Sequence, residues 1–421
     1  MTDHPVLAAV AHTGMRLGLP RVRSFLSFLG DPHLRYPVVH VAGTNGKGSV
    51  CRFVGAMLDA QGLRVGVTTS PHLQQVNERI RVGAAPISDD DLDRLLWRIE
   101  APMRAWARAE GLDGDGLPLT WFELSVAAAF QHFADTAVDV AVVEVGMGGR
   151  LDATNVVAPV VTSIVTVGLD HTEQLGPDHA SIAAEKAGIL KPGVPAVLGP
   201  LNPAALQVVR VVARDRGAPI DAYGEAYTVS GGDAGFTYRA EGVEREGLRV
   251  GLAGHHQVSN AGVAVRIVDR LPPSLRPSES AIRAGLLVAR NRGRLEWLAP
   301  DLLVDGAHNP DGAGVLASYL ASLPRDRRRT LLLGAGGEKD VRGVAAALAP
   351  HVDRVYTTSC AHPKARSPGD VATQLEGMPV PVSPVGPIEE ALPVARSNGD
   401  LVIVAGSLFL VGAVRDLVGA P

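Results

Sequence analysis

The sequence predicts an α/β protein with two domains: a large first domain built on a mostly parallel sheet, and a smaller α/β domain after it. The chain has 421 residues, 46% of them hydrophobic, and at about 100 to 200 residues per domain this length gives two or three domains with ample core. Short β-branched runs alternate with amphipathic stretches, which is typical of βαβ units. A fresh series of such runs follows residue 298, so we expect domains at 1–298 and 299–421.

Five apolar runs predict the strands of the first domain, and their continuous hydrophobicity indicates strands covered on both faces. They are PVVHVAG (37–43), RVGVTTS (64–70), VDVAVVEVG (138–146), VVTSIVTVG (160–168) and VPAVLG (194–199). Between the second and third runs we expect a helix with Ser88 as N-cap and Asp91 completing a capping box. TWFELSVAAAFQHF (120–133) predicts another helix.

The pattern changes after about residue 220. Gly-rich, alternating sequence over 227–254 predicts a small antiparallel sheet, and helices are expected at 256–270 and 278–289. Four further runs, each followed by helical sequence, predict the parallel strands of the second domain. They are DLLVDGA (301–307), TLLLGAG (330–336), DRVYTTS (353–359) and DLVIVAGS (400–407).

Charge and cysteine content exclude several classes of protein. Lys and Arg number 40 against 44 Asp and Glu, a net charge of −4, so no basic field favours nucleic acid. Cys51 and Cys360 show no disulfide or zinc spacing, which fits a reducing cytosol. The longest uncharged apolar stretch, 401–414, is shorter than the about 20 residues of a spanning helix. With no basic segment typical of a signal peptide, we expect a cytoplasmic protein without membrane partners.

GTNGKGS (43–49) is the strongest single motif, because it lies between a predicted strand and a predicted helix. Small glycines let backbone N–H groups approach a polyphosphate, and Lys47 neutralises its charge. The spacing differs from the standard P-loop, since Gly43 and Gly46 are three apart and a glycine separates Lys47 from Ser49. An ordinary Gly-rich turn would explain the glycines but not this lysine, in a chain whose basic residues are nearly all arginine.

A second group of polar residues follows the next predicted strands. Glu144 opens EVGMGGRLDATN (144–155) at the carboxyl end of a strand, where a Mg²⁺ ligand is expected near a phosphate loop; an exposed Glu closing a strand is the alternative. Asp170 and His171 follow another strand, and Lys186 lies in EKAGI. Taken alone, His171 is a loop histidine and Lys186 a solvated lysine, since Mg²⁺ prefers oxygen ligands.

The order of these and further motifs resembles the folylpolyglutamate synthase/dihydrofolate synthase family of the Mur ligase superfamily. After GTNGKGS come SPH (70–72), TWFE (120–123), EVGMGGRLDATN (144–155), DH (170–171), EKAGILKPGVP (185–195), HHQVSNA (255–261), GR (293–294) and DGAHNP (305–310). The resemblance extends from about residue 14 to GSLFLVGAVR (406–415). It implies a P-loop NTPase-like ATP-binding domain with a pterin site and a Rossmann-like C-terminal glutamate-ligase domain.

The resemblance implies an ATP-dependent amide ligase. Such an enzyme joins L-glutamate to dihydropteroate and, in the bifunctional bacterial type, extends reduced folates by further glutamates. A carboxylate is a poor electrophile, and its conversion to an acyl phosphate supplies a good leaving group for attack by the glutamate amine. The aromatic residue in TWFE resembles the dihydropteroate-using and bifunctional members more than those that only polyglutamylate.

The resemblance also assigns the site residues. For ATP they are Asn45, Gly46, Lys47, Gly48, Ser49, Asn260, Arg294, Asp305 and His308. For two Mg²⁺ ions they are Ser70, Glu144, His171 and Lys186, the lysine as a carbamate that supplies oxygen ligands, and Lys47, Glu144, His171 and Lys186 form the catalytic set. For the pterin they are Thr120, Trp121, Phe122, Leu151, Asp152 and Ala153.

Three alternatives remain open from the sequence. One is a monofunctional folylpolyglutamate synthase. Another is a Mur-type peptidoglycan ligase, although such ligases usually carry an extra N-terminal domain and only 42 residues precede the phosphate loop here. The third is a P-loop ATPase that drives a partner, for which a second domain bearing DGAHNP has no evident use. In the preferred interpretation the partners are ATP, L-glutamate, dihydropteroate and reduced folates, and the protein is a monomer.

Overall fold

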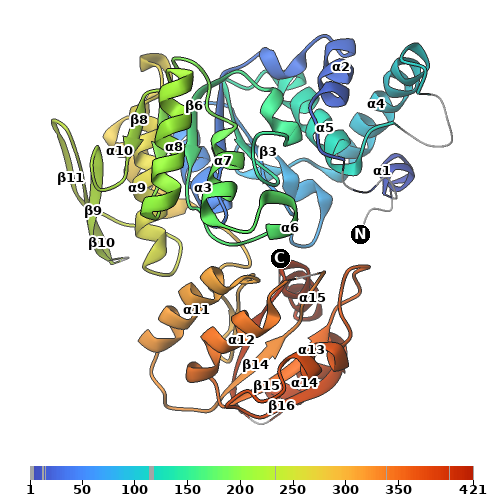
Figure 1. Ribbon diagram of the computed structural model, residues 1–421, viewed down its shortest axis with the longest axis vertical. Helices are drawn as coiled ribbons and strands as arrows, with labels where there is room; N and C mark the ends of the chain where they lie inside the picture. Colours follow the sequence, from blue (N-terminus) through green and yellow to red (C-terminus); the bar gives the residue numbers. More distant parts are fainter. Residues whose placement is uncertain are drawn as a thin grey trace. The chain divides into compact units, whose positions relative to one another are not determined.

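The computed structural model describes residues 4–11, 14, 16–112, 118–232, 234–337, 339–397 and 399–420. The chain divides into two compact units, Met1–Gly251 with Gln257–Arg290 and Leu252–His256 with Asn291–Pro421 (Figure 1). The division after Arg290 precedes the expected boundary at residue 298. The reason is that β12 (Glu296–Ala299) pairs antiparallel with β13 (Leu302–Val304) and so belongs to the sheet of the second unit.

An eight-stranded sheet forms the first unit, in the order β4-β3-β2-β5-β1-β6-β7-β8. Its strands are β1 (Val38–Ala42), β2 (Val65–Thr68), β3 (Ile80–Val82), β4 (Ala85–Pro86), β5 (Val140–Glu144), β6 (Pro159–Ile164), β7 (Ala196–Leu198) and β8 (Ile220–Ala222). The five predicted strands are all present, and the strands from β2 to β8 along this order pair in parallel. The antiparallel β3 and β4 at one edge and the short β8 at the other were not predicted.

Helices cover both faces of this sheet. The helices of this unit are α1 (Pro5–Val10), α2 (Pro20–Phe28), α3 (Lys47–Ala60), α4 (Asp89–Ala109), α5 (Trp121–Asp135), α6 (Thr172–Leu175), α7 (His179–Ala187), α8 (Pro203–Arg216), α9 (His256–Asp269) and α10 (Glu279–Val288). A Cβ at Gly66 would lie 2.8 Å from Phe133 of α5, and one at Gly55 of α3 would lie 2.9 Å from Val67. Since Gly66 and Val67 point to opposite faces, α3 and α5 cover opposite sides.

The α3 and α10 helices cross closely because Gly285 has no side chain. A Cβ at Gly285 would lie 2.4 Å from the backbone N and Cα of Met57. Backbone atoms cannot move aside as a flexible side chain can, so only glycine allows this approach. The contact fixes α10 on the helix that begins at the phosphate loop.

Two N-caps determine where the α4 and α5 helices begin. Ser88 Oγ accepts the Asp91 N–H at 3.1 Å, but it also donates to the Asp91 carboxylate at 2.7 Å. The expected capping box is therefore wrong in its second half, because the short Asp side chain bonds to the hydroxyl of Ser88. A full capping box occurs at α5 instead, where Thr120 and Glu123 satisfy each other's N–H groups.

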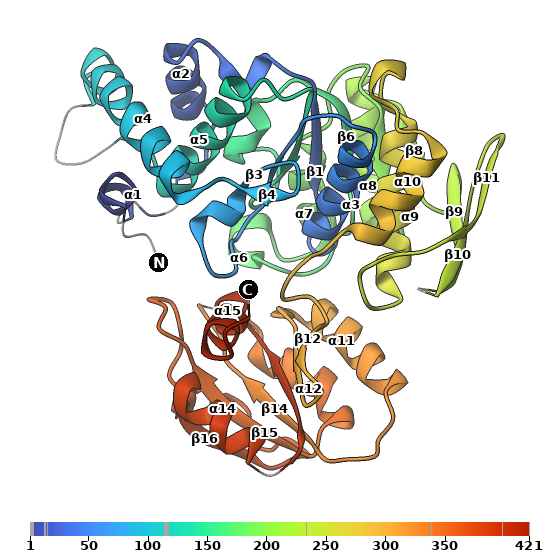
Figure 2. The same ribbon diagram turned by 180° about the vertical axis from the view of Figure 1, so that it is seen from behind.

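The predicted antiparallel patch is a three-stranded sheet of β9 (Tyr227–Gly232), β10 (Gly235–Ala240) and β11 (Val243–Leu248). It lies beside α9 and α10 (Figures 1 and 2). A Cβ at Gly262 of α9 would lie 2.5 Å from Val229 Cγ1 of β9. Both predicted helices, α9 and α10, are present.

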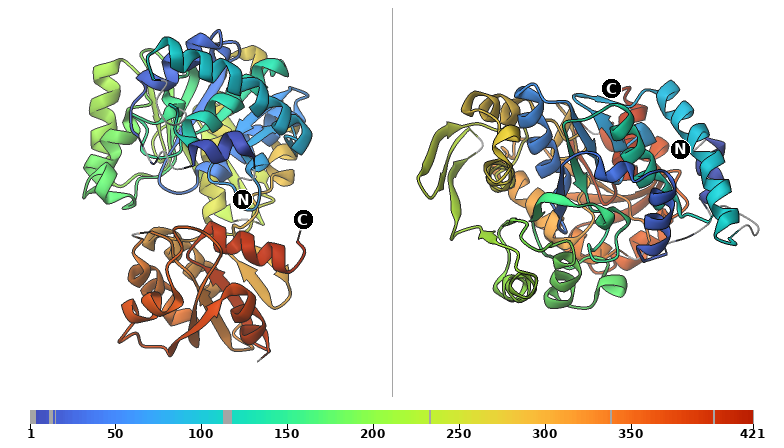
Figure 3. Two further views of the ribbon diagram at one scale, coloured as in Figure 1. Left: turned by 90° about the vertical axis from the view of Figure 1, so that its right-hand side faces the viewer. Right: turned by 90° about the horizontal axis from the view of Figure 1, so that it is seen from above.

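The second unit has a six-stranded sheet in the order β12-β13-β17-β14-β15-β16, parallel except for β12. Its further strands are β14 (Arg329–Leu333), β15 (Arg354–Ser359), β16 (Val382–Pro387) and β17 (Leu401–Ala405), and its helices are α11 (Pro310–Ser322), α12 (Val341–Leu348), α13 (Pro368–Gln374), α14 (Ile388–Arg396) and α15 (Leu408–Leu417). The α11 helix packs on α12 and α14 packs on α15. This unit is the orange-to-red part of the ribbon in Figure 3. The α/β class predicted for both parts is confirmed. No helix within the described residues is both long and apolar enough to cross a membrane.

Candidate active site

The phosphate loop joins β1 to α3 at the carboxyl edge of the sheet, as predicted. Gly46 is the N-cap of α3 with φ 81°, a left-handed conformation that glycine adopts without strain. A Cβ at Gly46 would lie 2.7 Å from Asn260 Oδ1 and 2.9 Å from Val165 Cγ1. Asn260 of α9, predicted from a distant motif, therefore lies directly against the loop.

Thr166, two residues after the end of β6, holds the loop in place, and the sequence did not single it out. The Thr44 N–H donates to the Thr166 carbonyl at 2.9 Å. The Asn45 N–H donates to Thr166 Oγ1 at 2.9 Å, and that hydroxyl donates back to the Asn45 carbonyl at 2.9 Å. A threonine after a buried strand carries no local signal for this role, because its partner is 121 positions away.

Two lysines converge on one carbonyl of the loop. Lys47 Nζ donates to Gly43 O at 3.0 Å and to Thr44 O at 3.1 Å, and Lys186 Nζ from α7 donates to Gly43 O at 3.0 Å. Lys186 is only 3% exposed, so it is not the solvated lysine of the alternative interpretation. Burial lowers the pKa of Lys186 to about 7, and the nearby charge of Lys47 acts in the same direction. A substantial fraction of its amine, about half at pH 7, is therefore neutral.

Glu144 ends β5 and is buried, so it is not an exposed residue closing a strand. Its Oε2 accepts the N–H of Ser70, 3.0 Å away, which brings the two predicted ligands of the first metal together. Within the described part of the chain, no group of three or more His, Cys, Asp or Glu could hold a metal. A carboxylate and a hydroxyl nevertheless fit Mg²⁺, which typically takes one or two carboxylates and completes its shell with phosphates and water.

The predicted ligands of a second metal lie on separate segments. His171 is the N-cap of α6 with φ 52°, and its side chain is 42% exposed. The preceding carboxylate, Asp170, favours the charged form of Lys186 and so opposes the fall in the pKa of Lys186. Asp170 thus lies within electrostatic reach of the buried amine.

Trp121 and Phe122, at the start of α5, belong to the expected pterin site. The Phe122 ring lies over Gly146, where a Cβ would come within 2.4 Å of it. The Trp121 ring packs under the guanidinium of Arg79, whose Cζ is 4.5 Å from the ring centroid. Trp121 Nε1 is buried and has no hydrogen-bond partner among the described residues. Arg79 also donates from Nε to His72 Nδ1 at 2.9 Å, and neither Arg79 nor His72 was predicted here.

The other predicted pterin residues shape the loops that surround these rings. Thr120 Oγ1 accepts the Glu123 N–H at 3.2 Å as the cap of α5. Asp152 accepts from the Met147 N–H at 2.8 Å and from the Thr154 N–H at 3.0 Å. Burial raises the pKa of Asp152, and these hydrogen bonds oppose the rise. Leu151 is half-buried, and Ala153 packs in the same cluster as the two aromatic rings.

In the second unit, the three predicted nucleotide residues gather at the carboxyl end of β13. Asp305 is buried and accepts the Leu295 N–H at 2.8 Å and the Ala307 N–H at 2.7 Å. Burial raises the pKa of Asp305, and the positive charge of Arg294 opposes the rise. His308 Nδ1 lies 2.8 Å from the Gly306 carbonyl.

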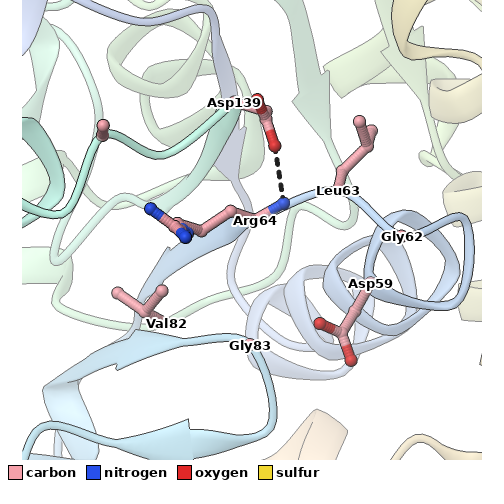
Figure 4. A pocket seen from close by; sticks show the side chains of 8 residues that line it. Asp59, Gly62, Leu63, Arg64, Val82, Gly83 and Asp139 are labelled. Carbon is pink, nitrogen blue, oxygen red and sulfur yellow. Dashed lines mark hydrogen bonds between the residues drawn. The ribbon is translucent and has the colours of Figure 1, made fainter.

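An open hollow of about 570 Å³ lies away from these residues. Arg64 and Asp139, which precede β2 and β5, line it together with Asp59 at the end of α3 (Figure 4). The hollow is therefore at the amino edge of the sheet, opposite the phosphate loop. There the Arg64 N–H donates to the Asp139 carboxylate at 2.7 Å and links the starts of β2 and β5. It contains none of the predicted site residues.

Comparison with known proteins identifies the family. The family described as Mur ligase, glutamate ligase domain, matches residues 293–408. A dihydrofolate synthase/folylpolyglutamate synthase of Bacillus subtilis strain 168 is 33% identical over 414 residues, which cover 96% of this chain and 95% of the relative. The chain belongs to the dihydrofolate synthase/folylpolyglutamate synthase family.

Solved structures of this family agree over nearly the whole length. Escherichia coli FolC in complex with DHPP and ADP has a TM-score of 0.88 and 31% identity, covering 98% of this chain and 96% of its own. A bifunctional folylpolyglutamate synthase/dihydrofolate synthase with Mn, AMPPNP and L-glutamate bound has a TM-score of 0.86 and 33% identity, covering 98% of both chains. Members of the family are ATP-dependent ligases, so this chain is an enzyme of that class.

Proposed function

We propose that this enzyme joins L-glutamate to dihydropteroate and extends reduced folates by further glutamates. The observation that carries the proposal is the convergence of Lys47 and Lys186 on Gly43 O, next to a loop shaped for phosphates and on the same sheet edge as Glu144. A pure nucleotide switch has no use for a second, buried amine there. The molecules bound in the two related structures, DHPP, ADP, AMPPNP and L-glutamate, support the same substrates.

The reaction proceeds through an acyl phosphate. A carboxylate oxygen of the pterin substrate attacks the γ-phosphorus of ATP, and ADP leaves. The amine of glutamate then attacks the acyl carbon, loses a proton and displaces phosphate. Lys47 and the N–H groups of residues 46–49 would hold the phosphates.

Metal and carbamate complete the proposed site. Ser70 and Glu144 would hold one Mg²⁺, and His171 and Lys186 a second; such ions supply neutralisation of charge on the phosphates. Lys186 Nζ would form a bond to the carbon of CO₂ and release one proton, which converts the amine into a carboxylate-like oxygen ligand. The burial that lowers the pKa of Lys186 to about 7 favours the neutral amine that this step needs.

The remaining predicted residues divide between the two units. Asn260, against Gly46, and Arg294, Asp305 and His308 of the second unit would contact the nucleotide. Trp121 and Phe122 would contact the pterin ring, with Leu151, Asp152 and Ala153 forming the loop beside them. Thr120 would act through its cap of α5.

The test is incorporation of labelled L-glutamate by the purified protein with ATP and Mg²⁺, in parallel with dihydropteroate and with tetrahydrofolate. Product from both acceptors is expected, and ADP release should require both an acceptor and glutamate. Product from tetrahydrofolate alone would make the enzyme a monofunctional folylpolyglutamate synthase. ATP hydrolysis that requires neither an acceptor nor glutamate would refute the proposal and favour the ATPase alternative.

A further inference from the structure

We infer that His40 is a positioning residue for the pterin substrate and that it acts through the side chains of Thr154 and Asp152. The inference rests on the proposed pterin site beside the GMGGRLDA segment. It concerns the hydrogen-bonded chain of His40, Thr154 and Asp152, in which only Asp152 has been assigned to the pterin.

His40 occupies an unusual place for an ionisable side chain. It lies in the middle of β1, fully buried, opposite Val143 of β5 and Thr162 of β6. By the alternation of a strand it points to the same face as Val38, which packs in the hydrophobic cluster formed with α5. An apolar residue would fill this place without the cost of desolvating a ring nitrogen. A buried imidazole is therefore expected to make a hydrogen bond here.

His40 belongs to a chain of hydrogen bonds, and the direction of each bond can be assigned. Thr154 Oγ1 is 2.5 Å from Asp152 Oδ1 and 2.9 Å from His40 Nε2. An ionised carboxylate only accepts, so the hydroxyl donates to Asp152 and accepts from His40. His40 is therefore the neutral tautomer with its proton on Nε2. Its Nδ1 is buried and has no partner among the described residues, so the ring is retained for its single donor.

Asp152 connects Thr154 to the turn that borders the proposed pterin site. Its Oδ2 accepts the Met147 N–H at 2.8 Å, while its Oδ1 accepts the N–H and the hydroxyl of Thr154. The carboxylate thereby ties the turn after β5 to the short helix η3 (Ala153–Val156). Gly146, which precedes Met147, is the residue against the Phe122 ring. A change in the orientation of Asp152 would move this turn relative to the ring on which the pterin is proposed to stack.

A purely structural role for His40 predicts a different result. His40 is three positions before Gly43 on the same strand, so a disturbance transmitted along β1 would reach the phosphate loop first. A disturbance transmitted through Thr154 would reach the pterin side and leave the loop unchanged. The two routes are distinguished by which Michaelis constant changes.

The experiment compares His40→Leu and Thr154→Val with the conservative His40→Gln and Thr154→Ser in the intact enzyme. Steady-state kinetics give kcat and the KM values for the pterin acceptor and for ATP, and thermal unfolding reports stability. His40→Leu and Thr154→Val should each raise the KM for the acceptor by about tenfold and leave that for ATP within about twofold. His40→Gln and Thr154→Ser, which keep a donor and a hydroxyl, should recover most of the loss.

Further outcomes decide against the inference. The double variant His40→Leu/Thr154→Val should have the same KM for the acceptor as Thr154→Val alone, because His40 acts through the Thr154 hydroxyl. Additive effects of the two substitutions would show that His40 does not act through Thr154. An unchanged acceptor KM with a lower unfolding temperature, or an equal rise in the KM for ATP, would make His40 structural. A wild-type protein that uses neither dihydropteroate nor tetrahydrofolate would overturn the proposed function, and this inference with it.

Discussion

Lys186 differs from the other lysines of the chain in its burial beside a second amine, and this makes its replacement informative. Lys186→Arg keeps the positive charge but removes the amine that CO₂ can modify. We expect turnover to fall by about a hundredfold or more, with thermal unfolding little changed. The exposed Lys364 provides the control, since Lys364→Arg should keep activity within about twofold.

The same amine predicts a dependence on pH and CO₂. Because burial lowers the pKa of Lys186 to about 7, the neutral, reactive form increases as the pH rises through 7. At a fixed concentration of dissolved CO₂, reactivation of CO₂-depleted enzyme should therefore increase from pH 6 to pH 8. Full activity in the rigorous absence of CO₂ would rule out the carbamate.

Trp121 offers a buried N–H donor that the described residues do not use. Trp121→Phe keeps an aromatic ring under Arg79 and removes only this donor. If the substrate supplies the acceptor, the KM for the pterin acceptor should rise by about three- to tenfold, the equivalent of one neutral hydrogen bond, at unchanged kcat. Trp297→Phe, at a half-exposed residue of the second unit, should leave the KM unchanged. Equal kinetics for Trp121→Phe and wild type would assign the indole to packing alone.

Sequence reasoning named candidate site residues that lie in motifs and passed over residues whose contacts depend on the fold. Lys47, Glu144 and Asn260 stand in recognisable segments, and the structure places Asn260 against the loop. Thr166 and His40 carry no such mark, because their partners are more than a hundred positions away. Only the pairing of β1 with its neighbours brings these groups together.

At the scale of elements, the α3–α10 crossing is the contact most sensitive to a single methyl group. Gly285→Ala places a Cβ 2.4 Å from the backbone of Met57, so the helices must separate. We expect the free energy of unfolding to fall by about 1–3 kcal/mol, measured by urea denaturation. Gly314→Ala in α11 meets no atom within 4 Å and should instead stabilise its helix by about 0.5–1 kcal/mol. Equal effects of the two substitutions would contradict the steric explanation.

The sequence predicted elements well where burial imposes a pattern and poorly elsewhere. β1, β5 and β6 are rich in apolar residues and almost wholly buried because helices cover both their faces. β4 is two exposed residues and β16 is partly exposed throughout, so neither has a run of apolar residues to reveal it. The capping box at Thr120 was legible as T-x-x-E, yet the threonine was assigned only to the pterin.

For the molecule as a whole, His40 predicts how stability changes in acid. Burial lowers the pKa of His40 from 6.5 to about 3, so below pH 6.5 the unfolded chain binds a proton that the folded chain refuses. The free energy of unfolding should therefore decrease as the pH falls from 6.5 toward 3, by about 1.4 kcal/mol per pH unit from this group. Above pH 6.5 the contribution is constant.

Comparison of wild type with His40→Gln isolates the contribution of His40 to the pH dependence of the free energy of unfolding. Asp152 and Asp305, whose pKa values burial raises, act in the opposite direction but are common to both proteins. Urea unfolding at pH 7.5 and pH 5.0, followed by tryptophan fluorescence, reports mainly the first unit, which contains Trp97, Trp106 and Trp121, whereas the second contains only Trp297. The variant should lose less stability between the two pH values. Identical losses would mean that His40 titrates normally in the folded protein.

The Gly43 carbonyl has a consequence for how the whole enzyme responds to its nucleotide. That oxygen accepts from the amines of both Lys47 and Lys186, and Thr166 fixes the loop from the other side. The receptor is thus preorganised, and nucleotide binding exchanges one set of hydrogen bonds for another instead of adding a new set. The enthalpy released on ATP binding should accordingly be smaller than the number of new contacts suggests. The entropic cost of binding should also be small, because no flexible loop has to be ordered.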